Sequence, residues 1–216
     1  MQINIMSIIK DSNVNGPGLR YTVWGQGCKK GCPNCYQPES WSHLKKNYMD
    51  TEDIANDILL FGADGVTFSG GDLMEQPVAF YDLLKKLHNA DGTLSKKIPQ
   101  GIICFTGYTV EEIGELPGEE GEYARKCRSM IDLLIDGRYV DALRHYNSLS
   151  GSSNQRLWWL DKSGRGKDIV DASRVDSTFD QEVEVHLSEE EGVVEITGFP
   201  SIDPKFLKAM GLKILK

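Results

Sequence analysis

Short apolar stretches typical of β-strands alternate with amphipathic stretches typical of helices over the first 135 residues. The expected strands cover residues 4–9, 19–26, 65–68, 101–106 and 131–135, and the expected helices begin near Asp50, Pro77, Thr109 and Glu122. Asp50 has the side chain of an N-cap, and Thr109 with Glu112 has the spacing of a capping box. Strands that alternate with helices at this interval predict an α/β protein with a mainly parallel sheet.

Each polar or glycine-rich signal in this region follows the end of an expected strand. Residues 27–35 follow the second strand, Ser69 to Asp72 end the third, and Thr106 ends the fourth. Because ligands of parallel α/β sheets bind at the carboxyl ends of the strands, we expect these residues to form one site.

The pattern changes after the sequence Gly-Ser-Ser-Asn-Gln at residues 151–155. Residues 182–187 and 193–197 alternate like two strands of a hairpin, and a short helix is expected from Asp203 or Pro204 to near Gly211. A length of 216 residues suits one domain with a small appendage. The sequence predicts a core at residues 1–156 and a C-terminal β-hairpin and helix appendage at residues 157–216, packed on that core.

Charge and hydropathy exclude two classes of partner. The net charge is −8 and the 24 Lys and Arg residues are scattered, which argues against binding a nucleic-acid backbone. No run of 18 apolar residues predicts a membrane span, and the first residues lack the features of a signal peptide. We therefore expect a cytoplasmic protein, in which clustered cysteines are metal ligands or catalysts and not disulfides.

Three of the five cysteines fall within eight residues, as Cys28, Cys32 and Cys35. Three thiolates with this C-x3-C-x2-C spacing can bind one 4Fe-4S cluster and leave its fourth iron open to another ligand. A structural zinc ion, with His43 as a fourth ligand, is the main alternative, but the spacing to His43 is unlike a zinc finger. Cys104 falls in an expected strand and Cys127 in an expected helix, so we expect packed interior thiols.

The Ser69-Gly70-Gly71-Asp72 segment has a functional and a structural interpretation. Glycines let a backbone approach a ligand closely, and an acidic side chain complements an ammonium group. A tight turn from strand to loop would also require glycines at these positions.

With an aromatic residue, Tyr36, directly after the last cysteine, the cysteine loop resembles that of the radical S-adenosylmethionine (SAM) superfamily. The resemblance implies an incomplete (βα) barrel in which the open iron chelates the methionine part of SAM. It also implies that the segment from Ser69 to Asp72 binds the amino group of SAM, with Leu73 where relatives usually have proline. Tyr36 would contact the adenine, partly through backbone groups. Asn34 and Cys35, which flank the same backbone segment, and Thr106 would belong to the same cofactor site.

Further segments resemble the activating proteins of anaerobic (class III) ribonucleoside-triphosphate reductases. They are residues 15–20, 106–108, 136–140 and 151–155. The resemblance implies that SAM is cleaved to a 5′-deoxyadenosyl radical, which removes a hydrogen atom from a glycine of a partner reductase. It implies a flavodoxin or ferredoxin as the electron donor. The alternatives are a radical SAM enzyme acting on a small molecule or peptide, and a non-catalytic iron–sulfur electron carrier or sensor.

Overall fold

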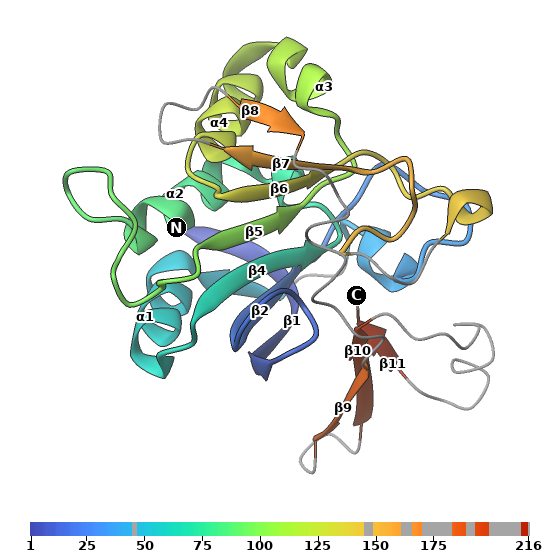
Figure 1. The fold of residues 1–216 in the computed structure, drawn as a ribbon, viewed down its shortest axis with the longest axis horizontal. Coiled ribbons are helices and arrows are strands. Elements are labelled where there is room, and N and C mark those ends of the chain that lie inside the picture. Colours follow the sequence, from blue (N-terminus) through green and yellow to red (C-terminus); the bar gives the residue numbers. More distant parts are fainter. Residues whose placement is uncertain are drawn as a thin grey trace.

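The computed structural model describes residues 1–44, 47–144, 149–160, 166–169, 183–188, 193–198 and 213–215. These residues form a large eight-stranded sheet and a small three-stranded sheet (Figure 1). The strands are β1 (Gln2–Ser12), β2 (Arg20–Gly25), β3 (Tyr48–Asp50), β4 (Gly65–Gly70), β5 (Ile102–Phe105), β6 (Leu133–Asp136), β7 (Arg156–Leu160), β8 (Gly166–Ile169), β9 (Val183–Ser188), β10 (Val193–Gly198) and β11 (Lys213–Leu215). The helices are α1 (Thr51–Phe61), α2 (Pro77–Leu87), α3 (Val110–Glu115) and α4 (Gly118–Arg128), with short 3-10 turns η1 (Pro38–Trp41), η2 (Leu73–Glu75) and η3 (Asp141–Leu143).

The centre of the large sheet is parallel, as the alternating sequence predicts. The strand order is β3-β1-β2-β4-β5-β6-β7-β8, and β2, β4, β5 and β6 run in one direction. Gly25 of β2 lies opposite Gly70 of β4, and Phe105 of β5 lies opposite Ile135 of β6. The carboxyl ends of the four strands therefore meet at one edge, where the polar segments follow them.

The flanks of this sheet are antiparallel. β1 pairs antiparallel with β2 and β3, and β7 pairs antiparallel with β6 and β8. The expectation of a mainly parallel sheet therefore holds only for the central four strands. The order of the described strands is linear, so the described part of the chain forms an open mixed sheet and no closed barrel.

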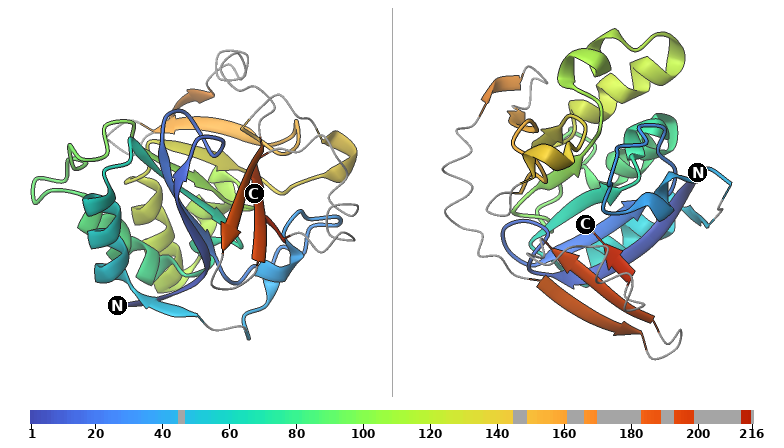
Figure 2. Two further views of the ribbon diagram at one scale, coloured as in Figure 1. Left: turned by 90° about the horizontal axis from the view of Figure 1, so that it is seen from below. Right: turned by 90° about the vertical axis from the view of Figure 1, so that its right-hand side faces the viewer.

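The sheet is apolar on both faces. Successive side chains of a strand point to opposite faces, so Cys104 and Leu134 join the core under the helices, while Ile103, Leu133 and Ile135 form a second cluster. Figure 2 shows the helices along one face of the large sheet. Cover on both faces explains why the parallel strands are continuously hydrophobic.

The helix starts confirm the capping predictions. The side chain of Asp50 accepts a hydrogen bond from Glu52 N at the start of α1. Thr109 and Glu112 form both hydrogen bonds of a capping box at the start of α3. None of the described helices has both the length and the apolar character needed to cross a membrane.

The small sheet contains the expected hairpin, because β9 and β10 pair antiparallel and β11 runs parallel to β10. The helix expected between Asp203 and Gly211 lies outside the described residues. Asn15 donates from Nδ2 to Thr197 Oγ1 at 2.8 Å, and Asn13 N donates to Glu184 Oε1 at 2.6 Å. These bonds join the small sheet to the loop after β1. The expected boundary at residue 156 falls within β7, which pairs with β6 in the large sheet.

Candidate metal centre at the carboxyl edge of the sheet

A pocket of about 120 Å³, partly open to solvent, lies at the edge where the parallel strands end. Its walls come from the cysteine loop, from η1, from the ends of β4, β5 and β6, and from residues next to η3 and β7. They are Cys28, Lys30, Cys32, Cys35, Ser40, Trp41, Gly70, Gly71, Phe105, Thr106, Gly107, Gly137, Tyr139 and Gln155. Of the expected site residues, the pocket brings together the three loop cysteines with Gly70, Gly71 and Thr106.

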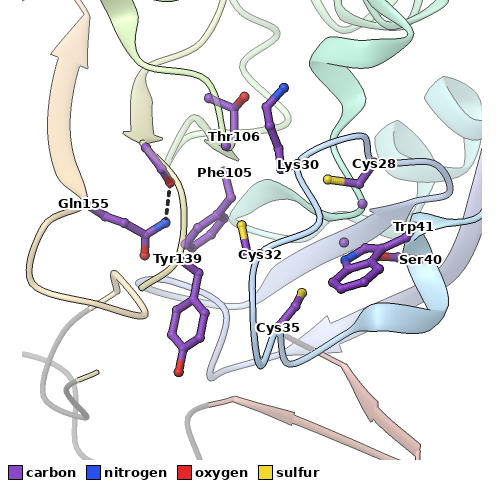
Figure 3. A pocket seen from close by; sticks show the side chains of 14 residues that line it. Cys28, Lys30, Cys32, Cys35, Ser40, Trp41, Phe105, Thr106, Tyr139 and Gln155 are labelled. Carbon is purple, nitrogen blue, oxygen red and sulfur yellow. Dashed lines mark hydrogen bonds between the residues drawn. The ribbon is translucent and has the colours of Figure 1, made fainter. Parts of the chain in front are cut away.

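Backbone hydrogen bonds hold the cysteine loop in place. Gly27 N donates to Ser40 O at 2.7 Å, and Cys28 N donates to Trp41 O at 3.2 Å, which fixes the start of the loop against η1. Cys35 N donates to Cys32 O at 3.0 Å, which closes a turn between these two cysteines. Figure 3 shows the three sulfur atoms on this loop, with Trp41 on one side of the pocket and Phe105 and Tyr139 on the other.

The three thiols of the cysteine loop line the pocket together. Among the described residues, no three His, Cys, Asp or Glu side chains converge closely enough to hold one metal ion. A 4Fe-4S cube takes each thiolate at a different iron, so its ligands are spread around a pocket. Burial raises the pKa of the Cys28 thiol to about 12 and also raises that of Cys32. Bound iron would offset this effect, because a cation favours the thiolate.

The other sulfur and imidazole groups lie elsewhere. Cys104 and Cys127 are fully buried in the main core, as expected for packed thiols. His43, the candidate fourth zinc ligand, does not line the pocket, and its Nε2 lies 3.6 Å from Glu75 Oε2.

Gly70 and Gly71 line the pocket, and packing alone already requires glycine at both positions. A Cβ atom on Gly70 would lie 2.7 Å from Gly25 N, and one on Gly71 would lie 2.4 Å from Gly27 O. Gly71 N also donates to Gly25 O at 2.9 Å. The loop after β4 therefore lies directly against the end of β2 and the start of the cysteine loop.

Asp72 is buried behind the pocket and does not line it. Its carboxylate accepts hydrogen bonds from Met74 N at 3.1 Å, from Thr106 Oγ1 at 3.0 Å and from Gly107 N at 2.9 Å. Burial raises the pKa of this carboxyl to about 6. The observed contacts connect the loop after β4 to the end of β5, and contact of the Asp72 side chain with a ligand ammonium stays a prediction.

Asn34, Tyr36 and Ser69 also lie outside the pocket lining. Asn34 has a positive φ of 56° and donates from Nδ2 to Asp141 Oδ2 at 2.8 Å. The ring of Tyr36 packs edge-on against Tyr139, with 5.2 Å between the ring centroids. Asn34 and Tyr36 thus connect the cysteine loop to the segment after β6, and Ser69 is buried at the end of β4. Their contacts with adenine or methionine stay predictions.

The pocket also contains side chains that the sequence did not single out. Lys30, Trp41, Phe105, Tyr139 and Gln155 all line it. Lys30 lies between the first two cysteines in the sequence, and Tyr139 and Gln155 lie in the segments at residues 136–140 and 151–155. These positions in the sequence were the only signal that could have assigned the three residues to the site. Gln155 Nε2 donates to Gly137 O at 2.9 Å, which brings these two segments together.

The segment at residues 15–20 does not line the pocket, and its residues Asn15, Gly16 and Arg20 are buried. Arg20 is fully buried, and its guanidinium donates to Thr67 Oγ1 at 2.7 Å, Val66 O at 2.6 Å and Gly101 O at 2.8 Å. A Cβ atom on Gly16 would lie 2.7 Å from Arg20 Cδ, so glycine leaves room for this side chain. The segment therefore stabilises the fold beneath the site.

Comparison with known proteins agrees with this site. Residues 14–158, which include the pocket, match the family of the 4Fe-4S single cluster domain. The chain is 30% identical over 148 residues to the anaerobic ribonucleoside-triphosphate reductase-activating protein of Escherichia coli K12, covering 66% of this chain and 89% of that protein. It is 28% identical over 149 residues to the protein of the same name from phage T4, covering 67% and 86%.

A third relative is the pyruvate formate-lyase-activating enzyme of Clostridium pasteurianum, which is 36% identical over 87 residues, covering 38% of this chain and 37% of that enzyme. The family match and these relatives show that the chain is an iron–sulfur protein of the radical SAM class. Within that class, the chain belongs to the family of the anaerobic ribonucleoside-triphosphate reductase-activating enzymes.

Proposed function

We propose that the protein binds one 4Fe-4S cluster through Cys28, Cys32 and Cys35, and SAM beside it, to activate an anaerobic ribonucleotide reductase. When bound and reduced, the cluster supplies the electron that cleaves SAM to methionine and a 5′-deoxyadenosyl radical, which takes a hydrogen atom from a glycine α-carbon. One observation supports this proposal most: the three cysteines share a pocket with Gly70, Gly71 and Thr106 at the carboxyl edge of the parallel strands.

In this proposal the protein groups around the pocket bind, orient and shield. The backbone of Gly70 and Gly71 has no Cβ atom between it and the pocket, so a ligand can approach it closely. The segments from Ser69 to Asp72 and from Asn34 to Tyr36 flank the pocket, where we propose that they receive the amino group and the adenine of SAM. The rings of Trp41, Phe105 and Tyr139 form apolar walls that exclude water from the reacting atoms.

The proposal also concerns the architecture. We take the parallel strands β2, β4, β5 and β6 as the centre of the incomplete (βα) barrel of the radical SAM fold, within a core of residues 1–156. Residues 157–216 would then be an appendage packed on the core. Asn15 and Thr197, one from each part, are hydrogen-bonded, which supports this arrangement.

The partner is proposed from the relatives and from chemistry. Two of the relatives are named as activators of an anaerobic ribonucleoside-triphosphate reductase, and one as an activator of pyruvate formate-lyase. A reductase of the first kind is therefore the leading partner, and a pyruvate formate-lyase is the second candidate. A low-potential flavodoxin or ferredoxin in the cytoplasm would supply the electron, since iron–sulfur potentials extend to about −700 mV.

Anaerobic reconstitution tests the proposal. The unaltered protein should bind about four irons and four sulfides, and should release methionine and 5′-deoxyadenosine from SAM after reduction with dithionite. Cys32→Ala should lose both properties. Cys104→Ala is the matched control, because Cys104 is buried in the core, and it should keep both. SAM cleavage by Cys32→Ala would reject the cluster assignment.

A further inference from the structure

Lys30 and Glu75 form a buried ion pair beside the cysteine loop. Lys30 Nζ lies 3.2 Å from Glu75 Oε1, and the two side chains are 7% and 0% exposed. Lys30 lies between Cys28 and Cys32 in the sequence and lines the pocket, whereas Glu75 belongs to η2, directly after the glycine loop. The pair therefore places two opposite charges next to the proposed cluster, where solvent screens them little.

Several contacts fix the Lys30 side chain. Its ammonium lies 3.0 Å from the centroid of the Tyr108 ring, a cation–π geometry, and its stem lies against Gly107, where a Cβ atom would be 2.7 Å from Lys30 Cγ. Glu75 Oε1 also accepts a hydrogen bond from Lys29 N at 2.9 Å. Lys30 thus joins three segments: the cysteine loop, η2 and the end of β5.

Nitrogen atoms of two further side chains lie near the buried Glu75 carboxylate. His43 Nε2 lies 3.6 Å and Lys29 Nζ 3.9 Å from its second carboxylate oxygen, Oε2. That oxygen is buried and receives no hydrogen bond from the described residues. The Glu75 carboxylate is therefore directed at the cations of the cysteine loop.

We propose that the Lys30 ammonium raises the reduction potential of the cluster and that the Glu75 carboxylate lowers it. The inference rests on the proposed function, because it requires the cluster. Reduction adds one electron to the cluster, so a buried positive charge nearby favours the reduced form and a buried negative charge opposes it. Glu75 and Lys30 act in opposite directions on the potential.

Midpoint potentials from an anaerobic dithionite titration test this inference, with the cluster followed by absorbance and electron paramagnetic resonance. Glu75→Gln keeps the acceptor for Lys29 N and removes the negative charge, so the potential should shift upward. Lys30→Gln should shift it downward, and the double variant should return close to the unaltered protein. Lys29→Gln is the matched control, because its side chain is 70% exposed, and it should change the potential least.

Shifts of Glu75→Gln and Lys30→Gln in the same direction would overturn the proposal, because a loosened loop affects both variants alike. A shift in Lys29→Gln as large as that in Lys30→Gln would overturn it as well. If Glu75→Gln binds no cluster, a comparison of Lys30→Arg with Lys30→Gln tests the proposal instead. Lys30→Arg retains the positive charge, so its cluster should keep the potential of the unaltered protein, whereas Lys30→Gln should lower it. Equal potentials in these two variants would reject the proposal. An unaltered protein that binds no cluster would reject the proposed function itself, before any variant is compared.

Discussion

The Thr106 hydroxyl lies 3.0 Å from each carboxylate oxygen of Asp72 and donates a hydrogen bond to this buried group. The resemblance to the radical SAM superfamily implies that both residues belong to the cofactor site, and in the structure they are hydrogen-bonded to each other. Thr106 lines the pocket, while Asp72 lies behind it. Their bond joins the end of β5 to the glycine loop after β4, so it holds two walls of the pocket at a fixed separation.

Removing the Thr106 hydroxyl should destabilise the protein. Thr106→Val keeps the shape of the side chain but leaves a buried carboxylate without one donor, which costs about 1–3 kcal/mol. Thr106→Ser retains the hydroxyl and should lose much less. Urea unfolding of the metal-free protein at neutral pH measures both, and equal stability of the valine variant and the unaltered protein would contradict the account.

Asp72 should make the stability depend on pH. Burial raises its pKa in the folded state from the ordinary 3.8 to about 6, so between these values the folded state binds a proton that the unfolded state has lost. The contribution of Asp72 to the free energy of unfolding therefore falls as the pH rises from about 4 to about 6. Two pKa units correspond to about 3 kcal/mol.

The difference in unfolding free energy between the unaltered protein and Asp72→Asn isolates this effect, because the other carboxyl groups are common to both. With cluster-free protein, the difference should change by about 3 kcal/mol over this pH range and be constant above it. A difference that does not vary with pH would show that the Asp72 carboxyl has an ordinary pKa.

An alanine at position 71 should displace the cysteine loop. Its Cβ atom would lie 2.4 Å from the backbone oxygen of Gly27. Because this is a backbone atom and not the end of a flexible side chain, the clash can be relieved only by moving the loop. Gly71→Ala should therefore lower the iron content after reconstitution. Gly114→Ala is the control, because no atom lies within 4 Å of the added Cβ in α3 and alanine favours a helix. Normal iron content in Gly71→Ala would contradict the packing described here.

Arg20 should matter for stability. Burial lowers the pKa of its guanidinium to about 10, and its donors reach carbonyl groups of both Val66 and Gly101. The single ammonium of Arg20→Lys cannot reproduce this fork, so at least one of these buried hydrogen bonds is lost, at a cost of about 1–3 kcal/mol. Lys10→Gln removes an exposed cation and should cost less than 1 kcal/mol. Thermal unfolding of Arg20→Lys and Lys10→Gln measures both losses of stability, and equal losses in the two variants would contradict the role given to Arg20.

Local signals explain what the sequence could predict. Three of these signals act within a few residues: the short apolar stretch of β4, the capping box at Thr109 and the proline at the start of α2. Each element forms as expected. The common edge of the strands follows from parallel pairing, so the meeting of the cysteines with Gly70 and Thr106 was predictable as well.

The remainder depends on contacts between distant residues. Asp72 accepts hydrogen bonds from Thr106 and Gly107, which lie more than thirty residues later in the sequence. The sequence does not indicate these donors, so the acidic side chain predicted contact with a ligand ammonium instead. The strand β7 pairs antiparallel with β6, and its pairing partner is not indicated by its own sequence. Lys30 faces the pocket because Glu75 and Tyr108 hold it there.

The central claim is that this protein places a radical on a glycine of a partner enzyme. The most direct measurement is electron paramagnetic resonance after anaerobic incubation of the reconstituted protein with SAM, dithionite and an anaerobic ribonucleotide reductase. The account predicts a doublet from a glycyl radical on the reductase, and no doublet with Cys32→Ala. Cleavage of SAM without a doublet, on this reductase and on a pyruvate formate-lyase alike, would contradict the claim.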